Sequence, residues 1–147
     1  MKVEHVTENK KDYLELLLIA DEQEEMIDRY LEKGDLYVLF DDGVKGVCVT
    51  VTDGDVGEIK NIATAEAARG KGYGRILIDY AADRCKEQGC STLLVGTGDS
   101  PLTVPFYEKC GFVRSHRIEN FFTDHYDHPI YEAGIQLKDM VYLKKNL

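Results

Sequence analysis

The sequence contains no apolar run that approaches the roughly 20 residues needed to cross a membrane as a helix. The residues Met1–His5 also lack the apolar stretch of a signal peptide. We therefore expect a cytoplasmic protein without contact to a membrane.

Basic residues are scarce as well. The 18 Lys and Arg are outnumbered by 27 Asp and Glu, which gives a net charge of −9 and a pI near 4.9. This balance argues against a nucleic-acid partner, because binding to a duplex depends on Lys and Arg that neutralise phosphates. An acidic surface instead suits small cationic partners.

No Cys-x-x-Cys pair occurs among the four cysteines, which lie at 48, 85, 90 and 110. The spacing therefore indicates neither a zinc knuckle nor a redox motif. We expect free thiols that are mostly buried, as is usual in a reducing compartment.

The chain length and the order of its apolar patterns predict one α/β domain over residues 1–147. We expect a mixed, mostly antiparallel sheet flanked by helices, because three strand-like runs form a meander and a later strand–helix–strand unit is typical of a parallel crossover. The expected strands are 3–6, 36–40, 44–52, 56–64, 92–95, one that begins at 111–113, and 138–144. The expected helices are 10–19, one that starts at an Asp21/Glu24 capping box and stops at Gly34, 74–88, and a short one with Pro101 at its first position. Residues 118–137 are predicted to be irregular.

A cluster of glycines and basic residues, Arg69-Gly70-Lys71-Gly72-Tyr73-Gly74, lies between an expected strand and an expected helix. Glycines allow the backbone to approach a ligand closely. The N–H groups of the first helical turn have no intrahelical partners, and the helix dipole favours negative charge there. The cluster therefore predicts a site for an anion, with a pyrophosphate as the best candidate.

Two nucleotide-binding motifs do not fit this cluster. A Walker loop requires Ser or Thr after its lysine, whereas Lys71 is followed by Gly72. A dinucleotide fingerprint requires Gly-x-Gly-x-x-Gly after the first strand of a βαβ unit, whereas here the glycines alternate and the preceding strands form a meander.

The cluster does match Arg/Gln-x-x-Gly-x-Gly/Ala, and Phe-Tyr-Glu-Lys-Cys-Gly-Phe follows at 106–112. With these two motifs and this order of elements, the chain resembles the GNAT superfamily of acyl-coenzyme A N-acyltransferases, in particular its small bacterial members. The resemblance extends from about Val3 to about Val113. It implies a sheet in which one parallel pair of strands splays apart, with acetyl-coenzyme A (acetyl-CoA) bound in the wedge.

The resemblance also implies roles for individual residues. The loop Arg69–Gly74 would hold the pyrophosphate, and the strand end Ile62, Ala63 and Thr64 would pair its backbone with the pantetheine arm. Tyr107 matches a tyrosine that protonates the departing thiolate or holds the cofactor sulfur in place. Ser100 stands where the family often has an asparagine that contacts the pantetheine.

Glu58, in the strand that precedes the loop, matches a position that some family members use as a general base. Such a base is required because an amine with a pKa near 10 is mostly ammonium at pH 7, and only the neutral form attacks a thioester. The alternative is a solvated glutamate near the end of a hairpin. No cysteine is placed as a nucleophile.

The segment 118–137 is rich in aromatic residues and histidine. His125 and His128, with Asp124 and Asp127, have the residue types of a zinc site. We favour a loop that packs its aromatics over the sheet and binds no metal. In a third interpretation the loop walls the acceptor pocket, where its carboxylates would suit a cationic amine. Exposed aromatics there would favour a homodimer.

These observations predict an N-acetyltransferase that transfers an acetyl group from acetyl-CoA to a primary amine in a ternary complex. We expect a small-molecule acceptor, because the sequence shows no docking extension. The alternatives are a catalytically silent acyl-CoA sensor and an acetyltransferase that acts on a protein N-terminus or lysine. The sequence does not identify the acceptor, the acyl-chain preference or the oligomeric state.

Overall fold

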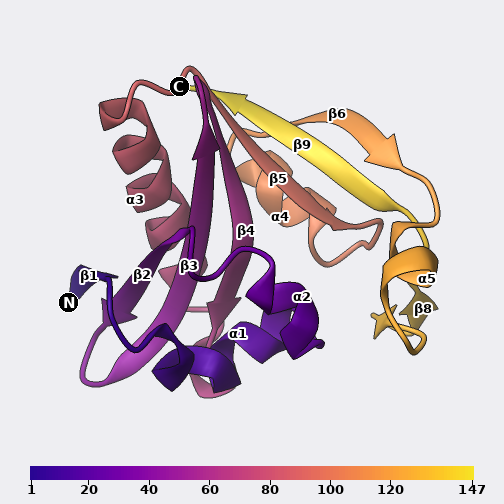
Figure 1. Cartoon of the computed structure of the whole chain (residues 1–147), viewed down its shortest axis with the longest axis horizontal. Helices are drawn as coiled ribbons and strands as arrows, with labels where there is room; N and C mark the ends of the chain where they lie inside the picture. The colour runs from indigo at the N-terminus through magenta and orange to yellow at the C-terminus, as the bar shows by residue number, and fades with distance from the viewer.

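A seven-stranded sheet forms the centre of the computed structural model, which describes all residues 1–147. Its strands lie in the order β1-β2-β3-β4-β5-β9-β6, and every neighbouring pair is antiparallel except β4 and β5 (Figure 1). The strand bounds are β1 Lys2–Val6, β2 Asp35–Phe40, β3 Val44–Asp53, β4 Val56–Thr64, β5 Thr92–Gly98, β6 Val113–Ile118 and β9 Met140–Asn146. The predicted mixed, mostly antiparallel sheet is thus confirmed.

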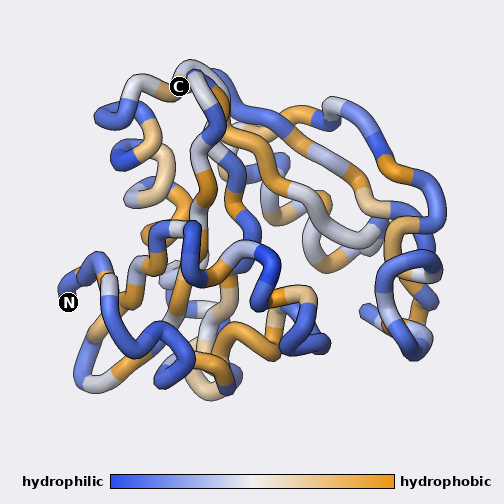
Figure 2. The backbone as a smooth tube through the Cα atoms, in the orientation of Figure 1, coloured by the Kyte–Doolittle hydropathy of each residue, from blue (hydrophilic) through white to orange (hydrophobic).

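Helices cover both faces of this sheet. The long helix α3 (Tyr73–Glu87) packs on β2, β3 and β4, and it shares an apolar core with α4 (Val104–Lys109). On the opposite face α1 (Leu14–Ala20) and α2 (Glu24–Asp28) build a second core. Figure 2 shows hydrophobic residues along the central strands and mainly hydrophilic ones on the outer turns.

The parallel pair β4 and β5 is hydrogen-bonded over only part of its length. The register runs from Val56 with Thr92 to Ile59 with Val95, although β4 continues to Thr64 and β5 to Gly98. Over its whole length β5 instead pairs with β9. The two parallel strands therefore diverge, as Figure 1 shows, and leave their facing edges open.

A β-bulge at Lys60 changes which face the second half of β4 presents. Asn61 pairs with Val49 and Ile59 pairs with Thr50, so Lys60 is the extra residue. Ile59 belongs to the core under α3, whereas Ala63 belongs to the core under α1 and α2. After the bulge the side chain of Asn61 points to the α1 face, where its amide reaches the Leu17 carbonyl.

The expected helix over 10–19 is divided in two. A 3-10 turn, η1 (Lys10–Tyr13), precedes α1, and the next helix is the short α2. The prediction of an Asp21/Glu24 capping box is wrong. Gln23 occupies the N-cap position of α2, and no side chain caps this helix. The carboxylate of Asp21 is instead bound by two tyrosine hydroxyls.

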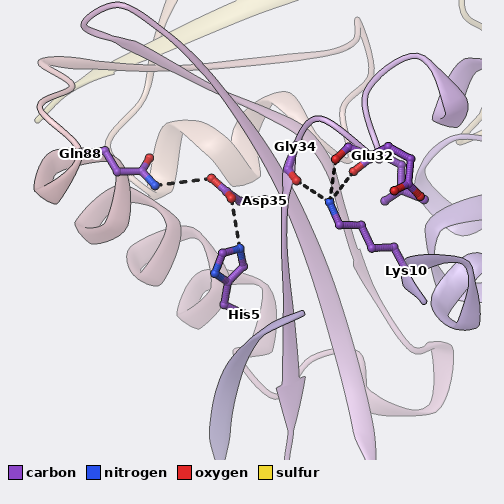
Figure 3. Close-up of polar contacts among 7 residues, drawn as sticks. His5, Lys10, Glu32, Gly34, Asp35 and Gln88 are labelled. Atoms are coloured by element: carbon purple, nitrogen blue, oxygen red, sulfur yellow. Dashed lines mark hydrogen bonds and ion pairs between the residues drawn. The ribbon is translucent and has the colours of Figure 1, made fainter. Parts of the chain in front are cut away.

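The buried ammonium group of Lys10 ties η1 to the chain that follows α2. Its side chain is 7% exposed, and Nζ donates to the carbonyl oxygens of Leu31 at 3.0 Å, Glu32 at 3.0 Å and Gly34 at 2.7 Å (Figure 3). These carbonyls follow the last turn of α2, where helix geometry provides no partner. Lys10 therefore satisfies the carbonyls of the turn that connects α2 to β2.

The last third of the chain departs from the predictions at two places. The short helix α4 begins at Val104, so Pro105 and not Pro101 lies in its first turn, and the Ser100 hydroxyl organises the preceding turn. Residues 118–137 are not all irregular: they contain α5 (Phe121–His125) and a hairpin of β7 (Tyr131–Glu132) and β8 (Ile135–Gln136). These elements close on a small core of Phe122, Ile130 and Leu137.

No helix of the structure is both long and apolar enough to span a membrane.

Candidate active site

A cavity of about 680 Å³ occupies the space between the diverging strands. Its walls are the splayed half of β4, the end of β5, the helix α4 and the segment after α5. Five residues predicted from the sequence line it: Ile62, Ala63, Thr64, Arg69 and Tyr107. The free backbone edge of β4 in this cavity suits an extended ligand that carries amide groups.

The glycine loop follows β4 in the chain, and its Arg69 lines the same cavity. Gly70 and Gly72 have φ of 80° and 84°, and Gly72 directly precedes α3. No side chain caps this helix, so its first N–H groups are free for a ligand. Backbone turns of this kind and a helix N-terminus together favour an anion.

Not every residue of the loop presents its side chain to a ligand. Tyr73 is buried, and its hydroxyl donates to Asp41 Oδ2 at 2.5 Å. A Cβ at Gly74 would lie 3.2 Å from Phe106, so the glycine allows α3 to pack closely on α4. Tyr73 and Gly74 therefore offer only backbone groups, while Arg69 and Lys71 offer charge.

Ser100 is 3% exposed and does not line the cavity. Its Oγ accepts a hydrogen bond from the Leu102 N–H at 3.0 Å, which stabilises the turn before α4. The structure thus gives this hydroxyl a local role, and its contact with the cofactor stays a prediction.

Tyr107 lies on α4 and is 6% exposed, packed edge to face against Phe106 and Phe112. It lines the cavity together with Arg69 of the glycine loop and Glu132 of β7. Burial raises the pKa of its phenol well above the usual value, and the nearby Cys48, Cys110 and Glu132 raise it further. The hydroxyl therefore keeps its proton at physiological pH and can donate it.

Glu58 faces a smaller cavity of about 220 Å³ that adjoins the first. Its Oε2 lies 3.0 Å from Lys60 Nζ and accepts a hydrogen bond from the Tyr142 hydroxyl at 3.3 Å. Burial and the charge of Glu58 raise the pKa of Tyr142 to about 12. Glu58 is thus a partly buried carboxylate with defined partners and not a freely solvated one.

Asp21 lines both cavities, although its position in the sequence predicted only a role as a helix cap. Tyr30 donates to its Oδ2 at 3.1 Å, and Tyr126, 105 residues away, donates to its Oδ1 at 2.7 Å. Burial raises the pKa of this carboxyl more than the two tyrosines lower it. In the sequence, only the aromatic segment 118–137 indicated an acceptor pocket here. Its residues Phe122, Tyr126 and Ile130 do line the cavity.

The histidines of this segment serve other contacts. His125 packs on Phe121 with ring centroids 4.6 Å apart, while His128 lies against Asp127 and Glu22. These carboxylates raise the pKa of His128. No group of three or more His, Cys, Asp or Glu side chains in the structure is arranged to hold a metal ion.

Comparison with known proteins decides the family. The family model described as "Acetyltransferase (GNAT) family" matches residues 5–112, which include the glycine loop and Tyr107. The chain belongs to the GNAT family. Over 150 aligned residues this GNAT protein is 37% identical to an uncharacterized N-acetyltransferase, YvbK, of Bacillus subtilis (strain 168), and the alignment covers 100% of the chain and 97% of the relative.

Two solved GNAT structures share the fold over nearly the whole chain. A GNAT family acetyltransferase from Elizabethkingia anophelis with acetyl-CoA bound superposes with a TM-score of 0.94 at 35% identity, covering 99% of this chain and 97% of that one. A Bacillus subtilis acetyltransferase in complex with CoA gives a TM-score of 0.91 at 38% identity, covering 99% and 98%. The predicted family and fold are thus confirmed.

Proposed function

We propose that this GNAT protein transfers an acetyl group from acetyl-CoA to a primary amine of a small molecule. The observation that supports this most is the single cavity that joins the β4 edge and Arg69 at one end to the Asp21 carboxylate at the other, with Tyr107 in its wall. One end has the groups to hold a thioester cosubstrate, and the other has a carboxylate suited to an amine. A ternary complex then needs no covalent enzyme intermediate.

The chain's own residues fit acetyl-CoA. The free amides at the start of α3, the positive-φ glycines Gly70 and Gly72, and the charges of Arg69 and Lys71 would bind the pyrophosphate. From Ile62 to Thr64 the edge of β4 that faces β5 has no partner strand, and its backbone groups would bind the pantetheine amides. A backbone amide at the end of β4 would polarise the acetyl carbonyl.

Proton transfers complete the reaction. Glu58, directly or through water, takes the proton from the ammonium form of the acceptor, and the neutral amine attacks the acetyl carbon. The C–S bond then breaks, and Tyr107 donates its proton to the departing thiolate. The second proton of the new amide nitrogen passes through water to the Tyr107 oxygen, which restores the phenol. The buried phenol suits this donor role because its raised pKa keeps it protonated.

The direct test of the proposal is release of CoA from acetyl-CoA when a panel of small primary amines is supplied. We expect thiol release that depends on both substrates, with the acetylated amine identified by mass spectrometry. Tight binding of acetyl-CoA without thiol release for any amine would favour a sensing module. Acetylation of peptides but not of small amines would favour a protein acetyltransferase.

Replacing Gly72 by valine should weaken CoA binding about tenfold, because holding a β-branched residue at a φ of 84° costs about 1–3 kcal/mol. A Cβ at Gly72 meets no atom within 4 Å, so the strain lies in the backbone that presents the amides. Calorimetric titration of CoA measures the change.

Gly54→Val is the matched control for this prediction, since Gly54 has a φ of 61°, lies in a hairpin turn and also has open space around it. Both variants should lose thermal stability, but only Gly72→Val should lose CoA affinity. Equal affinity in the two variants would contradict a role of the loop in binding the cofactor.

Replacing Glu58 by glutamine should lower kcat about a hundredfold while the dissociation constant of CoA stays the same, because a general base contributes about 10² or more. Glu4→Gln provides a matched control, since Glu4 also lies on a strand and pairs with a lysine two residues away, Lys2, at 2.8 Å. Steady-state rates with the best amine of the panel decide the matter. A kcat within twofold of wild type would remove Glu58 from the mechanism.

A further inference from the structure

The lining of the large cavity includes hydrogen-bond acceptors that no protein donor satisfies. Asn61 is 3% exposed; its Nδ2 donates to the Leu17 carbonyl at 2.9 Å and to the Tyr30 hydroxyl at 3.0 Å. Its Oδ1 is buried and has no partner, and the same holds for Oε2 of Glu132. Both residues line the cavity.

Buried polar atoms without a partner are rare and costly, so each calls for a specific reason. Here both atoms are oxygen acceptors, and they come from separate elements, β4 and β7. A ligand that brings several N–H donors into the cavity would satisfy them. A carboxylate or phosphate could not, because it has only acceptors.

Asp21 adds a negative charge to the same cavity and lies near Asn61, because the Tyr30 hydroxyl contacts both residues. The Tyr30 and Tyr126 hydroxyls donate one hydrogen bond to each carboxylate oxygen, which leaves further lone pairs free. Two tyrosines also fix the orientation of the carboxylate. Burial raises the pKa of Asp21, so its charge is undercompensated in the protein alone, and a cation would compensate it.

The remaining lining indicates what the cation is attached to. Ile19, Phe122, Ile130 and Leu137 make apolar walls between the polar groups. Of the basic residues that line this cavity, Lys60 is paired with Glu58, and Arg69 lies beside the glycine loop. The cavity therefore offers a substrate apolar walls and, in Asp21, a carboxylate that is paired with no basic residue.

We propose that Asp21, together with Asn61 Oδ1 and Glu132 Oε2, binds the ammonium group of an acceptor whose body is apolar. This inference rests on the proposed function and names the substrate class: hydrophobic primary amines. Asp21 binds and positions the amine, and Glu58, which faces the adjoining cavity together with Asp21, then removes its proton.

Binding of 2-phenylethylamine to the CoA-saturated protein at pH 7.5 tests the proposal by calorimetry, with the neutral 2-phenylethanol as the matched probe. We expect wild type to bind the amine, and Asp21→Asn to weaken this binding about tenfold or more. The alcohol should bind weakly and equally to both proteins. Asp28→Asn removes the same charge from α2 outside both cavities and should leave the affinity for the amine unchanged.

Thermal unfolding of each variant verifies that it is folded, and Glu132→Gln gives a second, independent variant that should also weaken binding of the amine. Absence of amine binding by wild type, equal affinity for amine and alcohol, or an unchanged affinity of both Asp21→Asn and Glu132→Gln would each overturn the proposal.

Kinetics separate this proposal from the proposed function. In the CoA-release assay Asp21→Asn should raise KM for the amine while kcat changes little. A fall in kcat with an unchanged KM would make Asp21 a base and overturn its role as an anchor. If the amine binds as expected but no amine releases CoA, the proposed function fails while the binding site stands.

Discussion

Tyr107→Phe should lower kcat about a hundredfold while the dissociation constant of CoA changes less than threefold. Proton donation by a positioned side chain contributes about 10²–10⁴ to a rate, and phenylalanine removes the donor while it keeps the ring. The ring itself should stay in place, because it packs edge to face between Phe106 and Phe112. CoA release with the best amine of the panel gives kcat, and calorimetry gives the affinity.

The pH dependence of the wild type provides a second readout. Burial, Cys48, Cys110 and Glu132 all raise the pKa of Tyr107 above the ordinary value of a phenol. A raised pKa keeps the acid protonated, so loss of this proton should not lower kcat as the pH rises through 10.0, the ordinary pKa of tyrosine. An alkaline fall in kcat near that pH that disappears in Tyr107→Phe would contradict the burial argument.

Tyr80→Phe is the control for this prediction. Tyr80 lies on α3, packs edge to face on Tyr37 at 5.2 Å and lines neither cavity. Loss of the Tyr80 hydroxyl should leave kcat unchanged. If Tyr107→Phe also retains the wild-type kcat, the thiolate must take its proton from another source, and Tyr107 would serve only to shape the cavity.

Lys10→Met should destabilise the protein by about 3 kcal/mol, because three carbonyls that now accept from an ammonium group would lose their donor in a buried setting. Methionine keeps an unbranched apolar stem, so the loss reports on the charged hydrogen bonds to Leu31, Glu32 and Gly34 shown in Figure 3. For a chain of this length the melting temperature should fall by about 6–12 °C, measured by calorimetry or circular dichroism.

Lys11→Met is the natural comparison, since the neighbouring Lys11 is 40% exposed and pairs with Glu24 and Asp28 at the surface. Exposed ion pairs contribute little to stability, so the melting temperature should hardly change. If Lys10→Met and Lys11→Met melt at the same temperature, the prediction is contradicted. Water would then replace the three hydrogen bonds of Lys10 with little loss of stability.

Local patterns in the sequence were sufficient for the central strands and the cofactor loop. The hairpins of β2, β3 and β4 follow from apolar runs separated by Asp-Gly turns, in which Gly43 and Gly54 have positive φ. The glycine cluster precedes α3 as predicted, because a helix start and the left-handed glycines before it are encoded within a few residues. Tyr107 of the second motif lies on α4 and lines the cavity, so its predicted role is compatible with its place in the fold.

The errors and omissions share one cause, which is interaction between distant parts of the chain. Asp21 was predicted to cap a helix, but its carboxylate accepts a hydrogen bond from the distant Tyr126. Lys10 was predicted to lie in a helix over 10–19, but its ammonium group donates to the Gly34 carbonyl.

The sequence by itself determined the family, the strands of the meander and the anion loop, since these depend on side-chain alternation and on backbone freedom at glycine. Only the tertiary structure brought together the residues of the proposed acceptor site. The bulge at Lys60 turns Asn61 towards α1, β9 inserts beside β5, and the segment after α5 returns to Asp21. Register shifts and long loop closures of this kind are fixed by packing across the whole domain, and no short stretch of residues encodes them.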